Sequence, residues 1–440
     1  MSLLTESRIT LKLAVPLVIG QVSQMLLGVA DTVMLGKIGV TELAVLTFVN
    51  SLFYIPFVFG IGLLTSISVF TSNARGARDD EAGRRSCRDG FQIATVLGLI
   101  LVFLAMLLTP FLDRFGQPDA VVARTGVFYT IIMISLLPAL MSLALKTHAD
   151  AMDRPWPAFW IFLGGVLVNV FLNWVLIYGN LGAPRLGLEG AAWATLTSRI
   201  LIVVAMLAWL NRSRSLQNWV PNRWFLSPEA GSIHRFLKIG FPASLQMVCE
   251  VTAFSAAGLL IGRFGEQAMA AHQIALMCAA TAFMVPLGLS MALSVRIGEA
   301  AGGCQFRRLQ PIALSGWGIG AGWALVGALI FLLFGKELAI LFNDDPSVTH
   351  LAARILVVVG IFQLVDSLQV ASSAMLRGLH DTRIPALLGF VSYWLIGIPI
   401  AIFLSVKLGW GSVGVWWGLA VGLAIACVLL CRRTWKMMKA

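Results

Sequence analysis

The sequence has few charged residues for its length. Of its 440 residues, 12% are charged and 58% are hydrophobic, with a mean hydropathy of +0.87. Soluble proteins carry about 25% charged residues, so a water-soluble globular protein is excluded. The short alternating segments of a transmembrane β-barrel are also missing. Apolar runs of roughly 20 residues, separated by short polar loops, indicate a polytopic α-helical membrane protein.

The usual motifs of soluble enzymes are missing as well. The chain has no GxxxxGK[ST] phosphate loop, no GxSxG elbow and no HExxH helix, and its five His residues are dispersed. Its six Cys residues contain no CxxC pair, so we expect neither a disulfide framework nor a metal cluster. GxxxG spacings carry little weight in a chain with 42 Gly. We therefore predict no enzymatic activity and no cofactor.

Acidic residues are fewer than basic ones, 21 Asp and Glu against 32 Lys and Arg. Most of the basic residues lie in loops on one side of the predicted membrane. This bias is the positive-inside pattern, which places both termini in the cytoplasm, so we do not expect a nucleic-acid partner.

Twelve apolar segments are long enough to cross a bilayer. They lie at about 10–35, 44–71, 91–111, 122–145, 157–178, 187–210, 236–262, 270–297, 312–334, 350–373, 384–406 and 413–431. The longest polar connection, residues 211–234, is the predicted cytoplasmic linker between an N-terminal lobe (1–210) and a C-terminal lobe (235–440) of six helices each. We expect Trp219 and Trp224 of this linker to lie at the membrane interface.

The two halves are related by an internal repeat. A shift of 226 residues aligns Pro16 with Pro242, and Gly36 with Gly262. Each half has an even number of spans, so both halves enter the membrane from the same side. The sequence therefore predicts a parallel repeat, with a cavity expected between its halves.

Three acidic residues lie well inside predicted spans: Asp31, Glu250 and Asp366. An ionisable side chain within a membrane is costly and usually functional. A proton or Na⁺ would remove the penalty of ionisation in an apolar site, and carboxylate oxygens are suitable ligands for Na⁺. We predict cation coupling at these residues, with Na⁺ possible at Glu250 and Asp366. A purely structural role, with neighbouring donors satisfying each carboxylate, is the alternative.

Uncharged polar residues accompany the carboxylates at helical spacing. As candidates for substrate binding or for a polar cavity lining, we select Gln24, Asn169, Asn173, Thr195, Thr197, Gln246, Gln273 and Gln363. Hydrogen bonds between packed helices are the alternative role for each of them. Arg199 is the single basic residue far from both ends of a predicted span, and the sequence leaves its role open.

Several of these residues lie in motifs that resemble the multidrug and toxic compound extrusion (MATE) family, in particular its NorM-type bacterial branch. The matching segments are Ala30-Asp-Thr-Val-Met-Leu-Gly36, the set Pro242, Gln246 and Glu250, Ala270-Ala-His-Gln-Ile274, Phe362-Gln-Leu-Val-Asp366, Leu376-Arg-Gly378 and Asp381-Thr382. The resemblance covers essentially the whole chain. It implies twelve helices in two six-helix lobes and a multi-pass protein of the bacterial inner membrane.

The resemblance also implies roles for individual residues. Glu250 and Asp366 match the carboxylates implicated in coupling in the C-terminal lobe, and Asp31 matches the acidic residue implicated in the N-terminal lobe. Asn173 stands where relatives have Asn or Asp, which weakens the case for a proton relay there. Several relatives carry Tyr where this chain has Phe362, so a cation site that needs that hydroxyl must be built differently.

From these observations we predict a secondary active multidrug efflux transporter. It would exchange Na⁺ or H⁺ for organic cations and other amphiphilic compounds by alternating access, in the lipid bilayer and as a monomer. A lipid-linked saccharide flippase of the same superfamily is the alternative, and only Arg199 favours it. The residues do not distinguish Na⁺ from H⁺.

Overall fold

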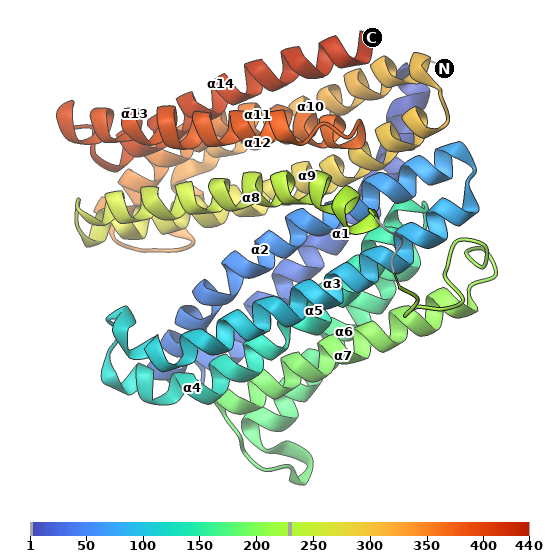
Figure 1. Cartoon of the computed structure of the whole chain (residues 1–440). Helices are drawn as coiled ribbons and strands as arrows, with labels where there is room; N and C mark the ends of the chain where they lie inside the picture. Colours follow the sequence, from blue (N-terminus) through green and yellow to red (C-terminus); the bar gives the residue numbers. More distant parts are fainter. Residues whose placement is uncertain (1–2, 228–230, 440) are drawn as a thin grey trace. The chain divides into compact units, whose positions relative to one another are not determined.

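The computed structural model describes residues 3–227 and 231–439, a part of the chain that consists of helices and connecting loops without a strand (Figure 1). Twelve of its helices are long and apolar enough to cross a membrane, which confirms the predicted all-α class. Ten of the spans consist mainly of one helix each: α1 (Leu3–Gly36), α2 (Val40–Ala77), α3 (Asp80–Leu108), α6 (Pro155–Tyr178), α7 (Leu188–Arg212), α8 (Ser232–Gly262), α9 (Glu266–Gly302), α10 (Leu309–Ile340), α11 (Pro346–Gly378) and α14 (Gly411–Lys439). An eleventh span is divided into α4 (Asp119–Ile134) and α5 (Leu136–Ala151).

Two of the spans are built from several shorter elements. α4 and α5 together form the span Asp119–Ala151, and α12 (Arg383–Phe390), η4 (Val391–Gly397), α13 (Ile398–Ile402) and η5 (Phe403–Lys407) form the span Arg383–Lys407. The remaining 3₁₀ turns are η1 (Thr109–Phe115), η2 (Asn180–Gly182) and η3 (Phe306–Arg308). η4 and η5 are π-helical, a form that is rare and is often found at functional sites.

Contacts between residues divide the chain into two compact units. We call residues 19–244 the N-terminal unit, and residues 1–18 together with 245–440 the C-terminal unit. Both divisions fall inside a helix, one in α1 and one in α8, and they lie 226 residues apart, like Pro16 and Pro242. The lobes 1–210 and 235–440 remain a prediction. The contacts differ from them in two places: they group the first half of α1 with the C-terminal unit and the first half of α8 with the N-terminal unit.

The first half of α8 is firmly part of the N-terminal unit. Phe236 belongs to the apolar core of this unit, and its ring lies 4.7 Å from that of Phe70. The Ser244 hydroxyl donates to the Phe59 carbonyl at 2.8 Å. A side chain at Gly240 would overlap the backbone of Leu63, so the two helices are in direct contact there. In the same unit α3 packs against α2 and α5, and α6 against α7.

The linker is folded against the N-terminal unit. Leu216 and Val220 are buried in an apolar cluster with Phe91 of α3 and Leu210 of α7. Trp219 and Trp224 pack against the same cluster, and their place at the membrane interface stays a prediction.

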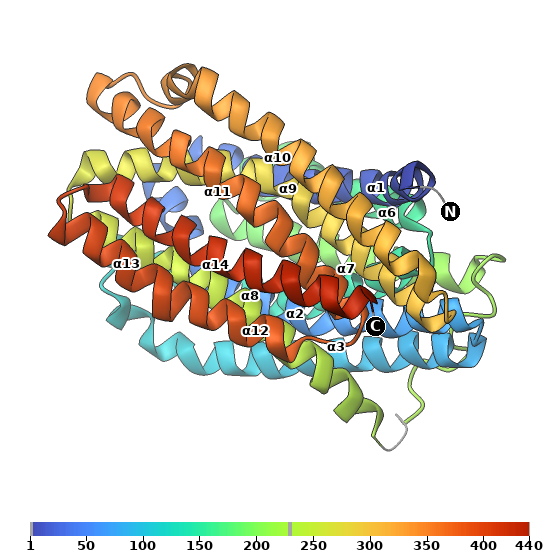
Figure 2. The same ribbon diagram turned by 90° about the horizontal axis from the view of Figure 1, so that it is seen from above.

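In the C-terminal unit α11 is the central helix. Figure 2 shows it between α10 and α14, and it also packs against α9. The described ends of the chain, residues 3 and 439, lie at the same end of the helices of this unit (Figure 1).

Glycine spacing matters on α14, although no local pattern in the sequence singles it out. Gly414, Gly418 and Gly422 are one helical turn apart, and a Cβ atom at any of them would overlap the backbone of the span Arg383–Lys407. Small residues at this spacing let two helices approach closely within a membrane. The glycines therefore hold the π-helical span directly against α14.

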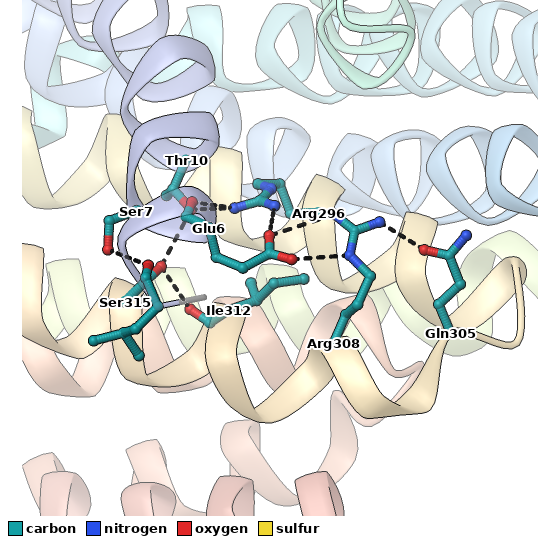
Figure 3. Close-up of polar contacts among 9 residues, drawn as sticks. Glu6, Ser7, Thr10, Arg296, Gln305, Arg308, Ile312 and Ser315 are labelled. Atoms are coloured by element: carbon teal, nitrogen blue, oxygen red, sulfur yellow. Dashed lines mark hydrogen bonds and ion pairs between the residues drawn. The ribbon is translucent and has the colours of Figure 1, made fainter. Parts of the chain in front are cut away.

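A buried ion-pair network holds the first half of α1 in the C-terminal unit (Figure 3). The Glu6 carboxylate pairs with Arg296 of α9 and with Arg308, whose Nε lies 2.9 Å from Glu6 Oε1. Arg296 also donates to Thr10, and the Thr10 hydroxyl is 3.3 Å from that of Ser315 on α10. Glu6 is fully buried, so its charge depends on these partners.

Candidate functional site

Glu250 lies near the middle of α8, in the half of the helix that belongs to the C-terminal unit. Its Oε1 accepts a hydrogen bond of 3.3 Å from the hydroxyl of Tyr393 in η4. The neighbouring Trp394 donates from its indole nitrogen to the carbonyl of Cys249 at 3.2 Å. Two successive residues of the π-helical segment, Tyr393 and Trp394, thus bond to α8, and Tyr393 bonds to the candidate carboxylate itself.

Asp366 of α11 is the second carboxylate of this region. Its side chain is buried, and Glu250 and Asp366 are close enough to interact electrostatically with each other and with Tyr393. Neither carboxylate forms an ion pair with any residue that the structure describes. Two carboxylates in one apolar environment repel each other when both are charged, so a cation or a proton would stabilise the pair.

Several buried oxygens near Asp366 lack a donor. Within the described part of the chain, Asp366 Oδ1, Gln363 Oε1, Gln369 Oε1 and Ser367 Oγ have no hydrogen-bond partner, and all four belong to α11. Such buried unpaired groups are uncommon in native structures. Oxygen atoms of this kind are also the ligands that a hard cation such as Na⁺ takes.

An aromatic cluster adjoins Tyr393, the hydrogen-bond partner of Glu250. Phe254 contacts Phe362, Tyr393 and Trp416, with ring centroids 5.8, 6.5 and 6.2 Å apart. Trp416 is fully buried and donates from its indole nitrogen to His272 Nδ1 at 3.2 Å. These rings keep the surroundings of Glu250 and Asp366 apolar, which makes an uncompensated charge there costly.

The predicted amides of the C-terminal unit lie in different environments. Gln246 donates to the Ser373 hydroxyl at 3.1 Å and lies against Gly389. Gln363 is buried and donates to the Ala279 carbonyl at 3.0 Å. Gln273 of α9 is exposed on the helix surface and has no side-chain hydrogen bond to any described residue. Gln246 and Gln363 are thus brought to the carboxylate region by their helices.

The polar residues of the N-terminal unit form a separate chain of hydrogen bonds. Asn173 of α6 donates to Asp31 Oδ1 of α1 at 2.6 Å and is 3.1 Å from Asn169 Oδ1. Asn169 in turn donates to the hydroxyl of Thr195 on α7 at 3.3 Å. Asn169, Asn173 and Thr195 are buried. Three helices thus bring together four of the residues that the sequence selected.

Gln24 and Thr197 do not join this chain of hydrogen bonds. Gln24 is half-buried on α1, and Thr197 is exposed on α7, one residue beyond a buried position. Neither makes a side-chain hydrogen bond with the residues that the structure describes. Their selection as cavity residues stays a prediction.

Arg199 of α7 lies beside this chain. Its guanidinium donates to the Ser135 hydroxyl at 2.6 Å and stands over the Phe53 ring, 4.7 Å from the centroid. It also interacts electrostatically with Asp31. A fixed positive charge thus lies within reach of the carboxylate of the N-terminal unit, whereas Glu250 and Asp366 have no such partner among the described residues.

Sequence reasoning missed Tyr393 as a neighbour of the carboxylates, and Trp416 and His272 as members of the adjoining aromatic cluster. Tyr393 is one of only four Tyr residues and stands in an apolar span, a signal that could have selected it. Its bond to Glu250 joins residues 143 positions apart, which no local pattern predicts. Phe362 has no hydroxyl, but Tyr393 of η4 brings one to this region.

Comparison with known proteins assigns this arrangement to a class. The family model described as MatE matches residues 16–175 and again residues 242–403, so both halves of the chain carry the same pattern. The two matches begin 226 residues apart, which agrees with the predicted repeat. The chain is therefore a membrane transporter, and it belongs to the MATE family.

Curated relatives extend over nearly the whole chain. A probable multidrug resistance protein NorM of Rhizobium meliloti is 34% identical over 440 residues, covering 99% of this chain and 94% of the relative. The multidrug resistance protein MdtK of Yersinia pseudotuberculosis is 31% identical and covers 98% of this chain and 95% of the relative. The predicted multi-pass membrane class and its relation to multidrug efflux transporters are thereby confirmed.

Solved structures show the same fold. A Vibrio cholerae MATE transporter, VcmN in its bent form, superposes with a TM-score of 0.89 at 19% identity, covering 99% of this chain and 98% of that chain. An outward-facing multidrug resistance MATE transporter gives 0.89 at 20% identity, covering 99% and 96%. At these identities the likeness concerns the fold, which is the MATE fold.

Proposed function

We propose that this protein exports organic cations and other amphiphilic compounds from the bacterial cell in exchange for Na⁺ or H⁺. The observation that carries the proposal is the carboxylate pair Glu250 and Asp366. Both lie within spans, neither has a basic partner among the described residues, and Tyr393, the hydrogen-bond partner of Glu250, belongs to a buried aromatic cluster. An ion that binds more tightly in one conformation shifts the equilibrium between conformations, which is the basis of coupled exchange.

The coupling ion binds, in this proposal, at the carboxylates and the unpaired oxygens of α11. Asp366 Oδ1 and Gln363 Oε1 are buried without donors among the described residues, and Tyr393 holds Glu250 in place. Na⁺ would take these oxygens as ligands, whereas H⁺ would convert one carboxylate into a donor for the other. Either ion removes the repulsion between the two charges.

Asp31 is the second candidate for the coupling ion. Asp31 accepts a hydrogen bond from Asn173, and Arg199 already supplies a positive charge nearby. We therefore expect Asp31 to depend less on an exchanging ion than Glu250 does. Arg199 was the one residue that favoured a lipid-linked saccharide flippase, and its contacts with Ser135 and Phe53 account for it without such a substrate.

Transport in proteoliposomes tests the proposal. Efflux of a fluorescent lipophilic cation is followed while a Na⁺ gradient and a pH gradient are imposed separately. We expect one gradient to drive efflux in the wild type and not in the Glu250→Gln variant. Glu266→Gln is the matched control, because Glu266 is exposed in the first turn of α9 and lies outside the carboxylate region.

Two outcomes would contradict the proposal. Wild-type efflux rates in Glu250→Gln would show that the Glu250 carboxylate is not needed for coupling. If the wild type binds substrate but its efflux responds to neither gradient, exchange for Na⁺ or H⁺ is excluded as the mechanism. Thermal unfolding of each variant in detergent separates a loss of coupling from a loss of folded protein.

A further inference from the structure

An open pocket of about 330 Å³ lies in the N-terminal unit, between the first turns of α3 and the linker residues 221–226. Its lining includes four basic residues, Arg84, Arg85, Arg88 and Arg223, and one acidic residue, Glu81. The positive-inside rule explains why basic residues occur in this part of the chain. It does not explain why they converge on one hollow.

The positive charge of the pocket is only partly compensated. Arg88 pairs with Asp89, whose Oδ1 lies 2.9 Å from the Arg88 Nε. Arg84 and Arg223 make no side-chain hydrogen bond or ion pair with any described residue. Arginine side chains that line a hollow and have no acidic partner there are available to an anion.

The wall of the pocket is fixed to α3 and is not a loose loop. Gln92 of α3 donates from its amide to the carbonyls of Trp224 and Leu226, both at 2.7 Å. The Trp224 ring lies edge-on to Phe91, 5.3 Å between centroids. Trp219 lies so close to α3 that a Cβ atom at Gly83 would overlap its ring. The linker therefore presents its arginine at a defined place in the lining.

We propose that this pocket binds a phosphate-bearing anion. The planar guanidinium matches phosphate oxygens in a two-pronged geometry, and several arginines around one hollow suit a group with three or more acceptor oxygens. The headgroup of an anionic phospholipid and a free phosphate compound share this chemistry. Basic pockets at the ends of membrane helices commonly hold such headgroups. The site is independent of the proposed transport function and shares no residue with it.

Binding measurements on the full-length protein distinguish the two sources. Native mass spectrometry counts short-chain phosphatidylglycerol retained by the detergent-purified protein, with zwitterionic phosphatidylcholine, which has no net charge, as the comparison. Equilibrium dialysis measures inorganic phosphate in the same lipid-free detergent. The pocket variant carries Arg84→Gln with Arg223→Gln. The matched control carries Arg307→Gln with Arg432→Gln, two exposed arginines outside the pocket whose loss gives the same change in charge.

We expect the pocket variant to bind phosphatidylglycerol about fivefold more weakly for each arginine removed, and the control to bind like the wild type. Glu81→Gln, which removes the acidic residue of the lining, is expected to strengthen binding. Loss of phosphatidylglycerol binding alone assigns the site to a lipid headgroup, and a parallel loss of inorganic phosphate binding extends it to free phosphate. Equal binding by the pocket variant and the control would overturn the proposal.

Discussion

The network around Glu6 allows a quantitative prediction of how the first half of α1 is held. In Glu6→Ala, Arg308 can turn to solvent, since 27% of its side chain is exposed and Gln305 still accepts from it at 2.6 Å. Arg296 cannot, because only 3% of its side chain is exposed. It keeps its bonds to Thr10 and to the backbone carbonyl of residue 6. The variant therefore removes the carboxylate that pairs directly with this buried guanidinium and leaves it the weaker electrostatic interaction with Glu299.

The free-energy cost follows from these contacts. Breaking a buried ion pair by removing one partner costs about 3–5 kcal/mol. The two remaining hydrogen bonds of Arg296 reduce this cost, and we expect about 2–3 kcal/mol for detachment of the helix start. Such a change corresponds to a roughly 30- to 150-fold increase in the population of the detached state.

Limited proteolysis measures that population. Arg8 and Lys12 are exposed trypsin sites on the same half-helix, and cleavage requires the helix to open locally. When opening and closing are faster than cleavage, the cleavage rate reports the opening equilibrium. We expect Glu6→Ala to raise the rate at these sites by the factor above, as followed by mass spectrometry in detergent.

Two further variants control the interpretation. Glu42→Ala removes a partner of the exposed Arg124 in the other unit and should leave cleavage at Arg8 unchanged. Glu6→Gln combined with Arg296→Gln removes both charges, so most of the protection should return. Wild-type cleavage rates in Glu6→Ala would refute the inference that this network holds α1.

Three other predictions concern the spans. Tyr393→Phe removes a hydrogen bond to Glu250, worth about 1 kcal/mol at a length of 3.3 Å, so the coupling-ion concentration for half-maximal transport should shift about fivefold. Asp31→Asn and Arg199→Gln should each reduce transport by leaving one charge uncompensated, and the double variant should recover it; no recovery would assign Asp31 to the exchanging ion. Gly418→Leu should lower the unfolding temperature in detergent through overpacking of about 1–3 kcal/mol or more, and an unchanged temperature would contradict the close contact of α14 with α13.

The positions of the spans were predictable because their signal is local. An apolar run of sufficient length fixes a membrane helix, and a charged residue within the run stands out against it. Glu250, Asp366 and Asp31 were found in this way. The helices extend past the apolar runs by several residues, since the polar helix ends gain hydrogen bonds that a hydropathy pattern does not register.

Contacts between distant residues were not predictable from one sequence. Glu6 and Arg296 are 290 positions apart, and each was only a charge near the end of a span. The stripe at Gly414, Gly418 and Gly422 could not be distinguished from other spacings in a chain with 42 Gly. Tyr393 reaches Glu250 from a π-helical turn, and apolar residues give no sign of a local change from α to π geometry.

The grouping of residues 1–18 with residues 245–440 has a consequence for biosynthesis. The start of α1 is made first, but its partners Arg296, Arg308 and Ser315 leave the ribosome only after the whole N-terminal unit has been translated. During that interval Glu6 must stay in water or at the lipid surface, where its charge is hydrated. Closure of the network is therefore a late step in folding, and a chain that stops before α9 cannot complete it.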